Sequence, residues 1–128
     1  MQTAGWQSEY VAEAGHVRAK ASGSLNLEHI RQMSSEVFAA GRQHDTHRCL
    51  IDVRDVFMDL TVQTIKQLPD ALQELGMSSK HRMALIYEGA SRRAGDISLF
   101  AVVSSLSGLQ VKAFTEETQA LQWLNEVG

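Results

Sequence analysis

Polar residues able to bind a ligand gather at two points of the chain, each shortly after an apolar run. Asp59 and Thr61 follow the run CLIDV at residues 49–53, and a polar loop at 88–96 follows the run MALIY at 83–87. The carboxyl ends of parallel strands meet at one edge of a sheet, and helix starts there present free N–H groups. We therefore expect one binding edge, made of Asp59, Thr61, Ser91, Arg92, Arg93 and Asp96.

The same residues also have a purely structural interpretation, which we favour. Asp59 or Thr61 can cap the helix that follows, because their side-chain oxygens accept hydrogen bonds from free N–H groups. Arg92 or Arg93 can pair with Glu88 or Asp96 in a solvated loop, and such surface pairs contribute little stability.

Other clusters give weaker evidence for chemistry. His44, Asp45 and His47 could ligate zinc, but the sequence marks no further ligand, so an exposed turn is the favoured interpretation. Ser104 and Ser105 fall inside a predicted helix, and no nucleophile elbow, phosphate loop, dinucleotide fingerprint or H-E-x-x-H motif occurs. We therefore expect no cofactor and no enzymatic activity.

Composition limits the class of protein. The 128 residues are 44% hydrophobic with a formal charge of −3, which favours one globular domain over residues 1–128 and argues against a nucleic-acid binder. No apolar run is long enough for a membrane span. The single cysteine, Cys49, is interpreted as a small buried hydrophobic residue. A chain that cannot form an internal disulfide is expected in a reduced, cytoplasmic compartment.

Hydrophobic periodicity predicts the elements that position these residues. Alternation around Gly15 indicates a β-hairpin, and the runs 49–53, 83–87 and 109–114 indicate three further strands. Helical spacing predicts a helix after Asn26 that stops at Gly41, one after Thr61 that Pro69 kinks or divides, one from Ile97, and one capped by Thr115. The fold class is α/β: a β-hairpin followed by αβαβαβα, with a mixed, mostly parallel five-stranded sheet.

Two segments resemble STAS domains, the fold of the bacterial anti-sigma-factor antagonists. CLIDVRDVFMDLTVQTIKQL resembles their central strand and helix, and GLQVKAFTEETQALQWL resembles their closing strand and helix. Ala120, Trp123 and Leu124 are similar to the SpoIIAA-like branch, which is also labelled STAS/SEC14-like. The resemblance implies a regulatory domain in which partners dock around the helix after the central strand.

One motif departs from that family. The antagonists carry Asp-Ser-Ser-Gly, whose first serine is phosphorylated, whereas this chain reads Asp59-Leu60-Thr61-Val62. Leu60 has no hydroxyl, so the phosphorylation switch does not carry over to it. Thr61 could accept a phosphate instead, although a helix cap is the favoured role.

These observations predict a non-catalytic cytoplasmic interaction module that binds a protein partner at the edge around Asp59, Thr61 and the loop from Ser91 to Asp96. Self-association through Trp6, Phe57 or Met58 is a further expectation. The alternative is a small-ligand module that holds an anion, a nucleotide or a lipid at the helix starts or under the helix from Ile97. Core packing competes with the lipid interpretation for those apolar side chains.

Overall fold

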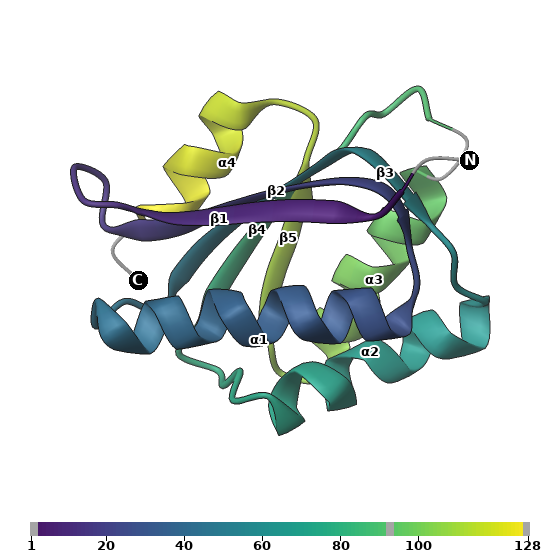
Figure 1. The fold of residues 1–128 in the computed structure, drawn as a ribbon, viewed down its shortest axis with the longest axis horizontal. Helices are drawn as coiled ribbons and strands as arrows, with labels where there is room; N and C mark the ends of the chain where they lie inside the picture. Colours follow the sequence, from purple (N-terminus) through teal and green to yellow (C-terminus); the bar gives the residue numbers. More distant parts are fainter. Residues whose placement is uncertain (1–2, 92–93, 127–128) are drawn as a thin grey trace.

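A five-stranded sheet carries helices on both of its faces in the computed structural model, which describes residues 3–91 and 94–126 (Figure 1). Strand β1 pairs antiparallel with β2, and the other neighbours, in the order β1-β2-β3-β4-β5, are parallel. The predicted fold class is confirmed. The elements are β1 (Gly5–Val11), β2 (His16–Leu25), α1 (Leu27–Gln43), β3 (Arg48–Met58), α2 (Val62–Glu74), β4 (Arg82–Ile86), α3 (Ala94–Leu106), β5 (Gln110–Phe114) and α4 (Glu117–Leu124).

The helices cover the two faces of the sheet unequally. Helices α1, α2 and α3 lie on one face, and α4 lies on the other (Figure 1). The larger core fills the three-helix side, and a smaller core under α4 contains Leu50, Ala84, Ile86, Ala120 and Leu124. Strands β3 and β4 are therefore buried on both faces, which explains their nearly continuous apolar sequences.

Strand β3 is longer than the predicted strand at residues 49–53, because it continues to Met58. Strand β4 ends at Ile86, opposite Asp52, whereas β2 continues to pair with β3 as far as Met58. The prediction ended too early because Arg54 and Asp55 are charged, yet both side chains are exposed on this extension. The structure thus moves the end of β3 well beyond the end of β4.

Two helix starts differ in how they are capped. At α1 the side chain of Asn26 accepts from the backbone N–H of His29 at 3.0 Å, and the His29 ring accepts from Asn26 N at 3.1 Å. This reciprocal pair confirms the predicted cap. The predicted cap of α4 is wrong, because Glu116 rather than Thr115 precedes the helix and makes no side-chain cap bond.

Helices α1 and α2 both continue past residues that were predicted to interrupt them, so the predicted stop at Gly41 and the predicted division at Pro69 are wrong. Helix α1 continues through Gly41 to Gln43, since this glycine is needed for close packing: a Cβ there would lie 2.8 Å from the carbonyl oxygen of Thr46. Helix α2 is a single helix from Val62 to Glu74 that contains Pro69. The proline is buried in the core side of α2, where its packing offsets the backbone hydrogen bond that it cannot donate.

The predicted hairpin is confirmed, with residues 12–15 forming its turn. None of the helices within the described ranges is long and apolar enough to cross a bilayer.

Candidate functional site

Thr61 is the N-cap of α2. Its backbone is extended, with φ −78° and ψ 160°, and its Oγ1 accepts from the backbone N–H of Thr64 at 3.1 Å. The Thr61 hydroxyl also lies 3.0 Å from the hydroxyl of Thr64. The capping interpretation is confirmed, and the hydroxyl is committed to the helix start.

Asp59 and Leu60 fix the turn that leads into this cap. The backbone N–H of Asp59 donates to the carbonyl oxygen of Leu25 at 2.8 Å, which extends the pairing of β2 with β3 by one residue. Leu60 is partly buried against the main core. The turn is therefore held by a backbone hydrogen bond, a buried side chain and a helix cap.

Two large apolar side chains flank this fixed turn on the solvent side. Phe57 is 44% exposed and Val62 is 54% exposed. Met58, between Phe57 and the turn, points into the core and is only 5% exposed, so it cannot serve as the predicted contact of a dimer.

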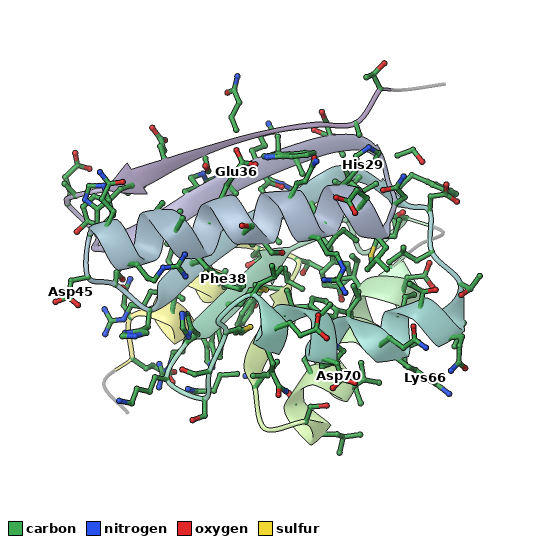
Figure 2. The ribbon with its side chains drawn as sticks, turned by 60° about the horizontal axis from the view of Figure 1, so that its bottom comes forward. His29, Glu36, Phe38, Asp45, Lys66 and Asp70 are labelled. Carbon is green, nitrogen blue, oxygen red and sulfur yellow. The ribbon has the colours of Figure 1, made fainter. Side chains whose placement is uncertain are left out.

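Trp6, another residue predicted for self-association, lies partly buried against the core. Its indole Nε1 donates to Glu36 Oε2 at 2.7 Å, and Glu36 lies on the side of α1 next to the β1–β2 pair (Figure 2). The tryptophan thus has a structural role in joining β1 to α1. Of the three residues predicted for self-association, Phe57 has the largest exposed fraction.

The loop after β4 reaches the side of the β3 extension. Ser91 forms a turn in which its N–H donates to Glu88 O at 3.1 Å and its carbonyl accepts from Ala94 N at 3.2 Å. Ser91 and Glu88 line a small space, about 10 Å³, together with Met58 of β3. Asp96 lies in the first turn of α3. Arg92 and Arg93, the cationic part of the predicted edge, lie outside the described residues.

The predicted edge is therefore divided between the two sides of β3. Asp59 is bonded to the β2 side, whereas Ser91 lines the small space on the β4 side of Met58. This division results from the unequal lengths of the two strands, because β3 continues beyond Asp52, the residue opposite the end of β4.

An ionic network on the α4 face of the sheet was not predicted from the sequence. Asp52, 1% exposed, accepts from Arg54 Nε at 3.0 Å and from Arg54 Nη2 at 2.7 Å. Arg18 lies 3.9 Å from Asp52 and pairs with Glu117 of α4 at 2.8 Å. The available signal was the single carboxylate within an otherwise apolar buried strand, since such a charge requires a partner.

The pKa of Asp52 is lowered despite its burial. Burial alone raises the pKa, but hydrogen bonds from the side chain and backbone of Arg54 and the positive charges of Arg54 and Lys20 together outweigh it. The carboxylate is therefore charged at neutral pH and holds β2, β3 and α4 together.

The other sequence candidates take structural positions. Tyr10 stacks on His44 with ring centroids 4.1 Å apart, and no group of three metal-ligating side chains occurs in the described part of the chain. Ser104 is fully buried in α3. Burial raises the pKa of the Cys49 thiol to about 12, so this cysteine is a poor nucleophile.

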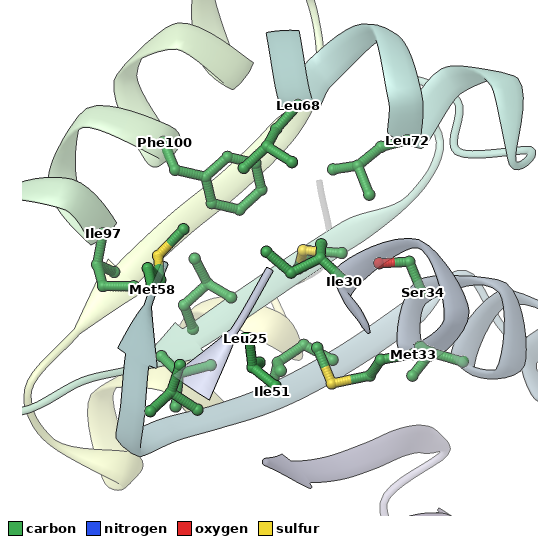
Figure 3. A pocket seen from close by; sticks show the side chains of 15 residues that line it. Leu25, Ile30, Met33, Ser34, Ile51, Met58, Leu68, Leu72, Ile97 and Phe100 are labelled. Atoms are coloured by element: carbon green, nitrogen blue, oxygen red, sulfur yellow. The ribbon is translucent and has the colours of Figure 1, made fainter. Parts of the chain in front are cut away.

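An apolar cavity of about 50 Å³ lies between the sheet and helices α1, α2 and α3 (Figure 3). Ile97 and Phe100 of α3 form part of its wall, as expected for an apolar face under this helix. Ser34 of α1 brings a hydroxyl to a lining that is otherwise apolar. The remaining lining residues are Leu25, Ile30, Met33, Val37, Ile51, Val53, Val56, Met58, Leu68, Leu72, Met83 and Leu85.

Two solved structures are similar to this chain over 97% of its length. Each of them is covered over nearly its whole length. One is an uncharacterized protein of the DUF3478 family with a SpoIIAA-like fold from Shewanella loihica PV-4, with 21% identity, 97% coverage of that chain and a TM-score of 0.62. The other is an anti-sigma factor antagonist from Mycobacterium paratuberculosis, with 15% identity, 96% coverage of that chain and a TM-score of 0.63.

No curated protein matches the chain. The model of the SpoIIAA-like family matches residues 16–125, which include every element from β2 to α4. The chain therefore belongs to the SpoIIAA-like family.

Proposed function

We propose that this protein is a non-catalytic interaction module that docks a partner protein on the edge around the turn of residues 59–61. The observation that carries the proposal is the exposure of Phe57 and Val62 on either side of that turn. Large apolar side chains on a rigid surface are typical anchors of protein interfaces, since little ordering is needed on binding.

The rigidity of the turn supports this function. The Asp59 hydrogen bond, the burial of Leu60 and the Thr61 cap hold the backbone between the two anchors. A partner would meet a preformed surface with the Asp59 carboxylate beside the apolar anchors. The likeness to the fold of an anti-sigma factor antagonist also supports a regulatory protein as the partner.

The proposed module is not switched by phosphorylation at the family's usual position. Leu60 carries no acceptor and packs against the core, and the nearby Thr61 hydroxyl is engaged with Thr64. Partner binding would then depend on the concentration of the partner rather than on a kinase that acts on this turn.

The proposal can be tested with a matched pair of surface variants. The double variant Phe57→Lys/Val62→Lys places charge on the proposed edge, and Val102→Lys places it on α3, where Val102 is 56% exposed. Partners captured by the wild-type protein are identified by mass spectrometry, and the affinity of each purified partner is then measured. We expect the double variant to lose binding and Val102→Lys to keep it. Binding that survives the double variant, or that only Val102→Lys removes, would overturn the proposed edge.

A second candidate function is the binding of a small apolar ligand in the cavity under α1, α2 and α3. Its apolar lining favours this function, since such cavities bind apolar molecules in preference to water. The volume of about 50 Å³ admits only a few heavy atoms unless a helix moves.

Methionine methyl groups provide a direct test of this second function. Met33, Met58 and Met83 line the cavity, whereas Met77 is buried in the core without lining it. Xenon, an apolar probe small enough for this volume, should shift the methyl NMR signals of the three lining methionines and leave Met77 nearly unchanged. Equal shifts for all four, or none, would contradict binding in the cavity.

A further inference from the structure

A polar groove lies at the opposite edge of the sheet, where β3, β4 and β5 begin. Its volume is about 640 Å³, and its lining includes Arg48, Arg82 and Gln110, the first residues of these three strands. The three residues are in register across the sheet. Lys80 comes from the turn before β4, and residues 44–47 come from the loop after α1, where Asp45 marks the end of the helix (Figure 2).

Arg48 and Arg82 lie directly opposite each other on neighbouring strands. Like charges in that position destabilise a sheet unless something else balances them. Arg82 is balanced within the protein, because its Nη1 donates to Trp123 O at 2.8 Å and to Glu126 O at 2.9 Å. Its guanidinium also lies 5.6 Å from the centre of the Trp123 ring.

Within the described ranges, the side chains of Arg48 and Lys80 have no comparable hydrogen-bond partner. No carboxylate among residues 3–91 and 94–126 pairs with either charge within 4.0 Å. The turn that carries Lys80 is held in place, since Gln110 Nε2 donates to Ser79 O at 2.7 Å. Two cationic groups, the planar guanidinium of Arg48 and the compact ammonium of Lys80, therefore line the same groove without a directly paired carboxylate in the described part of the chain.

The wall beside Arg48 is also preformed. Thr46 Oγ1 donates to Gly15 O at 2.8 Å and accepts from the backbone N–H of Arg48 at 3.2 Å, which joins the loop to the hairpin turn. Tyr10 stacks on His44 with the two rings nearly parallel, at an angle of 4°. A preformed wall lowers the entropic cost of binding a ligand.

The carboxylates of Asp45 and Glu126 also line the groove, against the three cations Arg48, Lys80 and Arg82. With the histidines neutral, the lining has one net positive charge, which suits a single small anion better than a polyanion. The planar donors of arginine match phosphate oxygens, and lysine adds a point charge. The groove is large enough for a small organic molecule attached to that anion.

We propose that this groove binds a small ligand that carries one phosphate group, with Arg48 and Lys80 as its principal donors. This site is separate from the edge around Asp59 and Thr61, so its existence does not depend on the proposed protein-interaction function. Inorganic phosphate and a phosphomonoester share the recognised group.

Calorimetric titration at constant ionic strength tests the site with two probes, inorganic phosphate and adenosine monophosphate. We expect at least one of them to bind saturably at a single site. Arg48→Ala and Lys80→Ala should each weaken that binding about tenfold or more, the size of one lost charge-assisted contact. Lys66→Ala removes an exposed lysine from α2, outside the groove, and should leave the affinity unchanged.

The outcome also identifies the source of the phosphate. Saturable binding of adenosine monophosphate alone would indicate a phosphomonoester, and equal binding of both probes would indicate recognition of the phosphate only. Failure of both probes to saturate, or equal weakening in Lys66→Ala, would overturn the proposal. Thermal unfolding of each variant without ligand checks that the protein is folded.

Discussion

Arg54 holds the buried carboxylate of Asp52 from two residues further along the same strand. Its Nε and Nη2 reach the two carboxylate oxygens at 3.0 and 2.7 Å, and its backbone N–H adds a third bond at 3.1 Å. A side chain on β3 thus satisfies a charge that would otherwise be costly so deep in the sheet.

Removing that side chain should destabilise the fold. Arg54→Ala leaves Asp52 with Arg18 at 3.9 Å as its nearest cationic partner, so we expect the free energy of unfolding to fall by about 1–3 kcal/mol at pH 7. Urea unfolding measures the change. Arg31→Ala, which removes an exposed pair with Glu74, is the control and should cost about 0.5 kcal/mol or less.

The same variant should change the acid stability. The lowered pKa of Asp52 gives stability that is present above its ordinary value of 3.8 and is lost as the pH falls through the folded-state pKa. In Arg54→Ala the pKa is no longer held down to the same extent, so less stability remains to be lost in acid. Equal acid dependence in the two proteins would show that Arg54 does not set this pKa.

Gly41 and Gly95 provide a matched test of packing against helix propensity. Gly41→Ala in α1 should destabilise the protein, because the new Cβ would lie 2.8 Å from the carbonyl oxygen of Thr46. Gly95→Ala in α3 meets nothing within 4 Å and should stabilise by about 0.5 kcal/mol. The midpoint temperature of thermal unfolding should fall in Gly41→Ala and rise in Gly95→Ala. Stabilisation by Gly41→Ala would contradict the close approach of residue 41 to Thr46.

The cap at Thr61 has an effect of known size. Thr61→Ala should lower the free energy of unfolding by about 1 kcal/mol, since the Thr64 N–H loses its acceptor, whereas Thr61→Ser should keep most of it. Chemical denaturation measures both variants. If Thr61→Ala were as stable as the wild-type protein, the hydroxyl would be free for another role at this edge.

The sequence predicted the elements better than it predicted their limits. Alternation around Gly15 and the apolar runs were sufficient for the hairpin and the parallel strands, because these patterns follow directly from burial. The end of β3 was missed because Arg54 and Asp55 resemble a turn in composition. Only the pairing partner β2, distant in the sequence, shows that the strand continues.

The arrangement of the residues at the proposed edge was predicted only in part, for the same reason. The cap at Thr61 is a local feature, and local sequence was sufficient to find it. Whether Ser91 lies beside Asp59 depends on how far β3 extends beyond the end of β4. No local sequence pattern indicates the length of that extension. The groove of Arg48 and Lys80 was likewise missed, because its residues come from separate strands and loops.

Two histidines, the buried His16 and the half-buried His81, should make the fold sensitive to mild acid. Burial lowers the pKa of His16, as do the charges of Arg18 and Arg48, while Glu117 opposes the shift. The His16 Nδ1 atom also has no hydrogen-bond partner among the described residues. Burial likewise lowers the pKa of His81, with His47 and Arg42 adding to the shift and the Ser78 backbone opposing it.

Because both histidines are held neutral in the folded protein, the unfolded chain binds protons more readily. The stability that the two neutral histidines contribute is fully present above pH 6.5, the ordinary histidine pKa. It is lost as the pH falls below that value. Urea unfolding at pH 7.5 and 5.5 should therefore show a lower free energy at pH 5.5. The double variant His16→Gln/His81→Gln should reduce that difference, because neither replacement side chain titrates. A double variant with the full wild-type difference would show that other groups cause the acid sensitivity.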